Sequence, residues 1–258
     1  MRFVHLERLS LMVVILGFTQ FSSAQCPYGF SDEFWPNGVA YAANPPARSI
    51  RKMSVVNFGT GPRLSLAGVF DSVGGVTTRG VGLWNGTGFE AAVGPSITTA
   101  NLNCIAVGSW NDGTGEKLVA SLQLPGAGGA LVWGIYKFDG TTWTMIGQPF
   151  DSLASSIRVL NDGSGPGLYA CGNFSSIGGV TLPTGVVKWD GIQWLPVGLT
   201  RPCNASNFRD IAVFDDGTGP TLYTTITCTG LPLSSAFPVA RMQSGDWALC
   251  SNGISGNG

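Results

Sequence analysis

Hydrophobic and polar residues alternate in short runs along the chain, and clusters rich in glycine, asparagine and aspartate separate the runs. The segment 156–197 illustrates the pattern: its runs at 156–160, 167–174, 185–189 and 192–197 predict four short strands. The connecting residues are those that form tight turns, and no segment has the 3.6-residue period of an amphipathic helix. The pattern therefore predicts an all-β protein built from four-stranded antiparallel sheets.

A turn motif recurs along the chain at nearly constant spacing. It reads NFGTGPRL, NDGTGEKL, NDGSGPGL and DDGTGPTL, starting at Asn57, Asn111, Asn161 and Asp215, so the spacings are 54, 50 and 54 residues. A second motif follows each copy, at 84–89, 138–143, 189–194 and 242–247. Two independent motifs with one period indicate an internal repeat of about fifty residues.

The Asp–Gly pairs of both motifs are interpreted as turn residues, because aspartate bonds its own backbone and glycine accepts positive φ. They are Asp112, Gly113, Asp139, Gly140, Asp162, Gly163, Asp190, Gly191, Asp216 and Gly217. The alternative, a calcium loop, requires alternating oxygen ligands and a later bidentate carboxylate. Here the acids are adjacent, and the first copy has phenylalanine at the second position. We therefore expect no metal site and no cofactor.

A four-stranded unit of about fifty residues has the size of a propeller blade, and neighbouring blades bury each other's faces. We predict a β-propeller of about four four-stranded antiparallel blades, at about 50–100, 101–153, 154–206 and 207–258. The alternatives are an open or incomplete propeller and an elongated β-repeat array.

The DDGTGPxL turn, the GxF…GGV segment and the WDGxxW hairpin together resemble a class of secreted bacterial repeat proteins with kelch-like β-propeller blades. The resemblance covers roughly residues 50–250. It implies a propeller fold and no particular activity. The chain departs from kelch proper in the distance from the double glycine to the tryptophan, and it lacks the tyrosine between them.

The first 24 residues are interpreted as a signal peptide, with an apolar run from Leu9 to Phe18 and small residues before cleavage after Ala24. The alternatives are a buried N-terminal element and a lipoprotein site at Cys26. The run is shorter than the ~20 residues that span a bilayer, and no later segment is long enough. The expected location is extracellular or in the cell envelope, including the periplasm, with no membrane insertion of the mature chain.

Charge and histidine content exclude several classes of function. Charged residues are 11% of the chain and the net charge is −1. No basic run is present, so a nucleic-acid partner is not expected. The single histidine, His5, lies in the signal peptide. The mature chain therefore cannot use Ser-His-Asp or Cys-His catalysis or a histidine-ligated metal.

An even number of cysteines in a secreted chain favours disulfides. The candidates are Cys26, Cys104, Cys171, Cys203, Cys228 and Cys250. A Cys203–Cys228 bridge would brace the fourth repeat. A Cys26–Cys250 bridge would fix the segment 25–49 as a strand that closes the ring with the last repeat. The alternative is that some of these cysteines are buried free thiols.

Candidate ligand-binding residues are those that break the repeat, because a unique site needs unique residues. Trp35, Trp110 and Trp133 could stack on sugar rings, and the alternative is that they pack in the core. The non-periodic acids could serve glycoside hydrolysis. These acids are Asp32, Glu33, Asp71, Glu90, Glu116, Asp151, Asp210 and Asp246. No residue is assigned as catalytic.

The sequence thus favours a secreted, non-enzymatic β-propeller that acts as an extracellular or cell-envelope binding module, with a protein or carbohydrate ligand. One rival is a propeller-type glycan-active hydrolase that uses the non-periodic carboxylates. Another is a structural fragment that is completed by forming a homo-oligomer.

Overall fold

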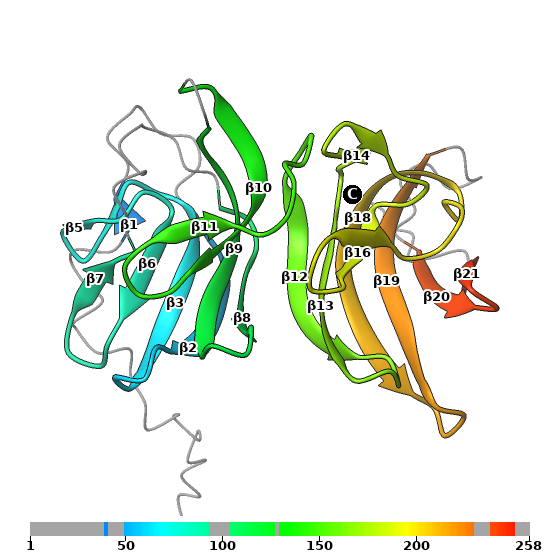
Figure 1. The fold of residues 1–258 in the computed structure, drawn as a ribbon, viewed down its shortest axis with the longest axis horizontal. Coiled ribbons are helices and arrows are strands. Elements are labelled where there is room, and N and C mark those ends of the chain that lie inside the picture. Colours follow the sequence, from blue (N-terminus) through cyan, green and yellow to red (C-terminus); the bar gives the residue numbers. More distant parts are fainter. Residues whose placement is uncertain (1–38, 41–48, 93–103, 127–128, 230–237, 251–258) are drawn as a thin grey trace, which may run out of the picture.

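The computed structural model describes residues 39–40, 49–92, 104–126, 129–229 and 238–250. These residues form strands and turns, with no helix among them. Figure 1 shows the strands gathered into sheets that follow the order of the chain. The predicted all-β class and the predicted four-stranded antiparallel sheets are confirmed.

Each repeat forms one four-stranded antiparallel sheet in the order of its strands. Sheet 1 contains β2 (Ser49–Asn57), β3 (Pro62–Val69), β6 (Val81–Trp84) and β7 (Phe89–Ala91). Sheet 2 contains β8 (Val107–Asn111), β9 (Glu116–Pro125), β10 (Leu131–Phe138) and β11 (Trp143–Met145). Sheet 3 contains β12 (Ala154–Asn161), β13 (Pro166–Gly172), β16 (Val186–Trp189) and β17 (Trp194–Pro196). Sheet 4 contains β18 (Asn204–Asp215), β19 (Pro220–Thr229), β20 (Val239–Gln243) and β21 (Asp246–Leu249).

Hydrogen bonds from side chains to the local backbone shape the turns between the strands. In sheet 3, Asn161 Oδ1 accepts from the amides of Gly163 and Gly165, both at 3.0 Å. Asp162 Oδ1 accepts from Ser164 through its amide at 3.1 Å and its hydroxyl at 2.6 Å. Gly163 has a φ of 99°, a value that side chains disfavour. These bonds close the β12–β13 hairpin at Asn161, opposite Pro166.

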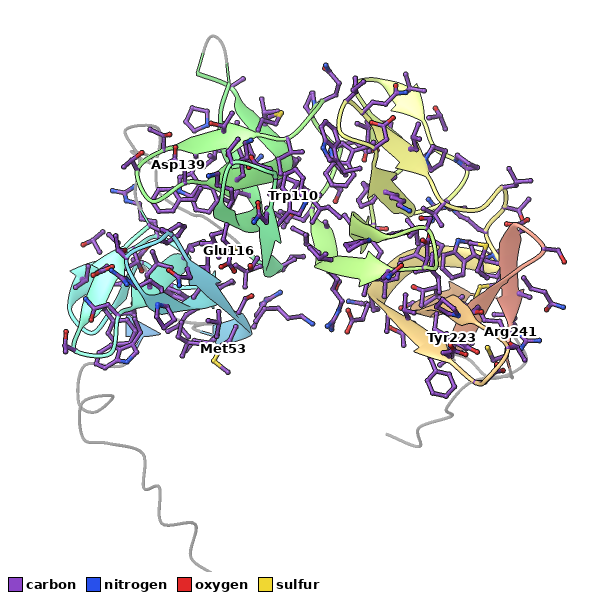
Figure 2. All side chains as sticks on the ribbon, turned by 60° about the horizontal axis from the view of Figure 1, so that its bottom comes forward. Met53, Trp110, Glu116, Asp139, Tyr223 and Arg241 are labelled. Carbon is purple, nitrogen blue, oxygen red and sulfur yellow. A yellow bond between two sulfur atoms is a disulfide. The ribbon has the colours of Figure 1, made fainter. Side chains whose placement is uncertain are left out.

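The second hairpin of the two middle repeats uses a single aspartate, and Asn85 occupies the equivalent place in the first repeat. Asp190 Oδ1 accepts from the amides of Ile192 and Gln193, both at 2.7 Å. Asp139, which is labelled in Figure 2, accepts in the same way through its Oδ1 from the amides of Thr141 and Thr142, both at 2.8 Å. The carboxylate therefore fixes the backbone of the tight turn between the third and fourth strands.

Two small sheets lie outside the four main ones. Residues 175–179 lie between two predicted strands, 167–174 and 185–189, and were interpreted as a loop, but β14 (Ser176–Ile177) pairs with β15 (Val180–Thr181). Glycines with positive φ at 178 and 179 make this tight hairpin, which explains the error.

The other small sheet contains β1 (Val39–Ala40), β4 (Ser72–Val73) and β5 (Val76–Thr77). The segment 25–49 was expected to donate a strand to the last repeat. Its described part, β1, pairs instead with β4 of the first repeat, with Val39 opposite Val73. The remainder of this segment lies outside the described residues.

The hydrophobic core consists of layers between successive sheets. The layer between sheets 1 and 2 contains Val56 and Leu83 from one sheet and Leu118 and Phe138 from the other. Two further buried clusters fill the spaces between sheets 2 and 3 and between sheets 3 and 4. Contacts between the first strands run from β2 to β8, from β8 to β12 and from β12 to β18. The sheets therefore form a series with sheets 1 and 4 at its ends (Figure 1).

A tryptophan–carbonyl hydrogen bond crosses each boundary between successive sheets. The indole Nε1–H donates to a backbone oxygen of the preceding sheet's last segment. The pairs are Trp143 with Ala92 at 2.7 Å, Trp194 with Ile146 at 2.8 Å and Trp247 with Val197 at 2.9 Å. Each acceptor lies three residues after the aromatic residue that starts the preceding repeat's last strand. The same motif therefore sets the relative position of all four sheets.

The described cysteines fall into two classes. The expected Cys203–Cys228 disulfide is present, with the Cα atoms 5.9 Å apart. Cys104 and Cys171 are buried free thiols, as in the alternative reading of the cysteine count, and Cys250 is an exposed thiol. Cys26 lies outside the described residues, and so does any bridge from it. Within the part of the chain that is described, no helix is long and apolar enough to cross a membrane.

Candidate functional site

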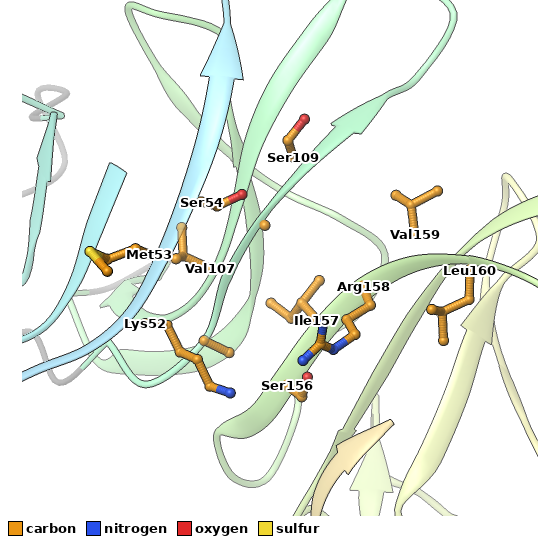
Figure 3. Close-up of a pocket in the computed structure, with 12 residues that line it drawn as sticks. Lys52, Met53, Ser54, Val107, Ser109, Ser156, Ile157, Arg158, Val159 and Leu160 are labelled. Carbon is orange, nitrogen blue, oxygen red and sulfur yellow. The ribbon is translucent and has the colours of Figure 1, made fainter. Parts of the chain in front are cut away.

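A groove of about 330 Å³ lies where the first strands of three sheets converge (Figure 3). Its lining comes from 52–54 of β2, from 156–160 of β12, and from 106–109, at and just before β8. Apart from Ala106, the lining residues belong to β2, β8 and β12, so the first strands of three sheets define its shape. Its volume falls at the lower end of ligand clefts, which run from roughly 300 to 1,000 Å³.

The repeat places equivalent residues around this groove. Lys52, Ala106, Ser156 and Asp210 each lie five positions before the start of a turn motif, so they keep its spacings of 54, 50 and 54. The first three line the groove, and the fourth bonds to the third. In sheets 1, 3 and 4 a β-bulge directly precedes this position. A bulge changes the direction in which the following side chains point. The four equivalent positions carry different side chains: a lysine, an alanine, a serine and an aspartate.

Arg158 and Asp210 form an ion pair from sheet 3 to sheet 4. The guanidinium Nε and NH2 donate to the two carboxylate oxygens at 3.0 and 2.8 Å. Ser156 Oγ donates to Asp210 Oδ1 at 2.6 Å. Burial alone would raise the pKa of Asp210, but the hydrogen bonds from Arg158 and Ser156 hold it at about 2. The carboxylate is therefore ionised and anchored at neutral pH.

Lys52 brings a second positive charge to the same region. Figure 3 shows the Lys52 and Arg158 side chains extending into one space from opposite strands. The charges of Lys52 and Arg158 both act on the buried thiol of Cys171. Burial and Asp210 raise the pKa of Cys171, while Lys52 and Arg158 lower it. No carboxylate among the described residues forms an ion pair with Lys52. The groove therefore has two cations against one carboxylate.

The aromatic candidates lie elsewhere. Trp110 on β8 and Trp133 on β10 are half-buried and pack against the cluster between sheets 2 and 3. Neither lines the groove. This packing matches the alternative interpretation of these two residues. Trp35 lies outside the described residues.

The non-periodic acids that the structure describes do not gather in one place. Glu90 accepts from Asn85 and Arg63, and these bonds lower its pKa against the effect of burial. Glu116 accepts from the Asn57 amide of sheet 1 at 3.1 Å and from the Ser109 hydroxyl. Asp32 and Glu33 lie outside the described residues.

Two further acids of this set hold neighbouring repeats together. Burial would raise the pKa of Asp151, but hydrogen bonds from Ser175 lower it. Asp246 accepts from the Thr200 hydroxyl at 2.6 Å and from the Thr200 and Leu199 amides, and these bonds lower its pKa. The backbone carbonyl of Asp71 accepts from the amides at 78 and 79. The Asp151 and Asp246 side chains thus serve turns and contacts between strands.

Sequence reasoning missed a partner of the periodic turn aspartates. Lys137 Nζ lies 2.5 Å from Asp112 Oδ2, and Lys188 Nζ lies 3.3 Å from Asp162 Oδ2. Tyr169 also donates its hydroxyl to Asp162 at 2.5 Å. The signal was available, because each lysine directly precedes the aromatic residue that opens the second motif. The turn aspartates therefore anchor the third strand as well as the turn.

The described residues contain no group of three or more histidine, cysteine, aspartate or glutamate side chains that could hold a metal ion. Comparison with family models and with curated proteins found no match to this chain. The groove and its residues therefore carry the functional argument.

Proposed function

We propose that this protein is a secreted, non-enzymatic binding module that takes its ligand in the groove between the first strands of its sheets. One observation carries the proposal. The turns, the core layers and the indole bonds repeat from sheet to sheet, whereas the groove positions differ in every repeat, as at Lys52, Ala106 and Ser156. The repeated features stabilise the fold. The residues that differ meet in the groove, where they can form a single asymmetric binding site.

In this proposal the four sheets are the blades of an open or incomplete β-propeller with kelch-like repeats. The first strands contact in series, as the innermost strands of blades do. The repeated indole bonds fix each sheet against the one before it. The groove then corresponds to the axial channel of the propeller.

Binding without turnover is favoured by the state of the carboxylates. A glycoside hydrolase needs a general acid whose pKa is raised, next to a second carboxylate. Glu90, Asp151, Asp210 and Asp246 all have lowered pKa values, held by hydrogen bonds to other repeats or strands. Asp210, which adjoins the groove, is committed to Arg158.

Export is supported by the N-terminal apolar run and by the Cys203–Cys228 disulfide, because disulfides persist in oxidising compartments. The proposed location is extracellular or in the cell envelope.

The test is an array of glycans and peptides combined with a hydrolysis screen on the same ligands. We expect one ligand class to bind, no product to form, and binding to weaken when groove residues such as Ser54 are enlarged, as in Ser54→Trp. A matched Ser164→Trp variant, in an exposed turn, should bind normally. Product formation, or no binding by any ligand class, would contradict the proposal.

Self-association is a second candidate function, and it concerns the end sheets. On β2, Met53 and Val55 are 63% and 58% exposed, and Phe214 on β18 is 59% exposed. Leu64 lies opposite Val55 in sheet 1 and is half-buried. The equivalent residues of sheets 2 and 3, Leu118 and Leu168, are buried between sheets. A second copy could cover these faces by packing its sheet 4 on sheet 1. Sedimentation velocity tests this candidate: a dimer that Met53→Lys disrupts supports it, and a monomer at all concentrations excludes it.

A further inference from the structure

The charges in the groove indicate the chemistry of its ligand. We propose that the groove binds a carboxylated sugar, such as a uronic acid residue of an acidic oligosaccharide, with the carboxylate between Lys52 and Arg158. This inference rests on the proposed function, because it specifies the ligand of the same groove.

The sign of the charge in the groove favours an anionic ligand. Lys52 comes from sheet 1 and Arg158 from sheet 3, and the fold directs both side chains into one space (Figure 3). Asp210 neutralises one of these two charges. Bringing like charges together is unfavourable, and an anion placed between them removes the penalty. The chain as a whole has a net charge of −1, so this local positive charge is not a property of the whole surface.

Several hydrogen-bond donors of Arg158 and Lys52 stay available for a ligand. Arg158 uses its Nε and one NH2 hydrogen for Asp210, so three of its five N–H groups are free to bind another oxygen. The Lys52 ammonium offers three donors. A carboxylate accepts about four hydrogen bonds and pairs well with a guanidinium.

The remaining lining of the groove suits the ring and hydroxyl groups of a sugar. Serine hydroxyls line the groove at Ser54, Ser109 and Ser156. Ser109 and Ser156 already donate to Glu116 and Asp210, so their oxygens can accept hydrogen bonds from sugar hydroxyls. Val107 and Ile157 provide an apolar wall. A groove with hydroxyls, two cations and a short apolar wall suits a polar ring that carries an acid group.

The experiment compares tri-galacturonate with galactotriose, its neutral counterpart, by isothermal titration calorimetry on the full mature chain. Tri-galacturonate should bind, and galactotriose should bind at least about tenfold more weakly. Lys52→Gln should weaken tri-galacturonate binding about tenfold, as expected for the loss of a charged contact. Lys117→Gln, which alters a half-buried lysine at the start of β9 outside the groove lining, should leave it unchanged. Arg158 is left intact because it also joins sheets 3 and 4.

Each outcome decides between the two proposals. Equal binding of both trisaccharides, or binding that ignores Lys52→Gln, overturns the carboxylated sugar while the binding module stands. Competition by sodium sulfate as strong as that by free galacturonate shows a simple anion site and also overturns it. If neither trisaccharide binds but another class on the array does, the inference fails alone. If nothing on the array binds, both proposals fail.

Discussion

Trp194 donates its indole N–H to the backbone carbonyl of Ile146 at 2.8 Å, across the boundary between sheets 3 and 2. The ring is buried, and the same bond recurs at the two other boundaries. A tryptophan at one position of the repeat therefore fixes how each sheet packs against the preceding sheet. The first repeat has Phe89 at this place, and no sheet among the described residues precedes it.

Removing the donor should destabilise the protein. Trp194→Phe keeps an aromatic ring but leaves the Ile146 carbonyl without its partner, which costs roughly 1–3 kcal/mol in free energy of unfolding. Trp189→Phe is the matched control, because the Trp189 indole makes no hydrogen bond to the described residues and its ring is half-buried. Urea denaturation measures both. An equal effect of the two substitutions would show that ring size matters and the hydrogen bond does not.

Gly147 allows the next sheet to approach. Its φ is +73°, and a Cβ there would lie 2.7 Å from the Trp189 ring and 2.9 Å from that of Trp194. Gly191 has a φ of +104°, and no atom lies within 4 Å of the position that its Cβ would take. Gly147→Ala should therefore lower the free energy of unfolding by roughly 1–3 kcal/mol more than Gly191→Ala. Both variants share the strain of positive φ, so equal losses would contradict the close approach.

The Asp112–Lys137 pair should show strong coupling in a double-mutant cycle. The Asp112 side chain is only 7% exposed, so Lys137→Leu leaves its carboxylate without a cation. The first repeat carries Phe58 and Leu83 at the two equivalent positions, which suggests that an apolar pair replaces the ionic one. Asp112→Phe combined with Lys137→Leu should recover roughly 0.5–3 kcal/mol relative to the sum of the single changes. Additive effects in chemical denaturation would contradict this.

Stability should fall in acid partly through Asp210. Its pKa is about 2 in the folded protein, against roughly 3.9 in an unfolded chain. Because the folded pKa is the lower one, the carboxylate's contribution is complete above about pH 4 and disappears as the pH falls toward 2. The stability difference between the protein and Asp210→Asn should therefore shrink over this interval. A difference that stays constant from pH 6 to pH 2.5 would show that the charge on Asp210 does not stabilise the fold.

Local features of the fold could be predicted from the sequence, because they depend on neighbours in the chain. The strands of sheet 3 and the turns at Asp162 and Asp190 follow from alternation and turn chemistry. The hairpin at 176–181 was missed because its two glycines were interpreted as a loop. The pairing of β1 with β4 depends on a long-range contact that the sequence pattern does not encode.

The candidate site was harder to predict. The aromatic and acidic residues that break the repeat were chosen for their chemistry, and most of them pack in layers or hold turns. The groove residues Lys52, Ser156 and Arg158 lie at fixed offsets before the turn motif. Their differences could be read in the aligned repeats, but their convergence appears only when the first strands meet in space. A repeat indicates where copies are equivalent, and the fold decides which equivalent positions face one another.

Hydrogen exchange of the tryptophan indoles, followed by NMR, tests the repeated sheet boundary most directly. We expect the Nε1–H groups of Trp143, Trp194 and Trp247 to be protected together, because each is bonded to the preceding sheet. The half-buried indoles of Trp110, Trp133 and Trp189 should exchange much faster. Rapid exchange of the first three, at the rate of the other three, would contradict the stacked arrangement of the four sheets.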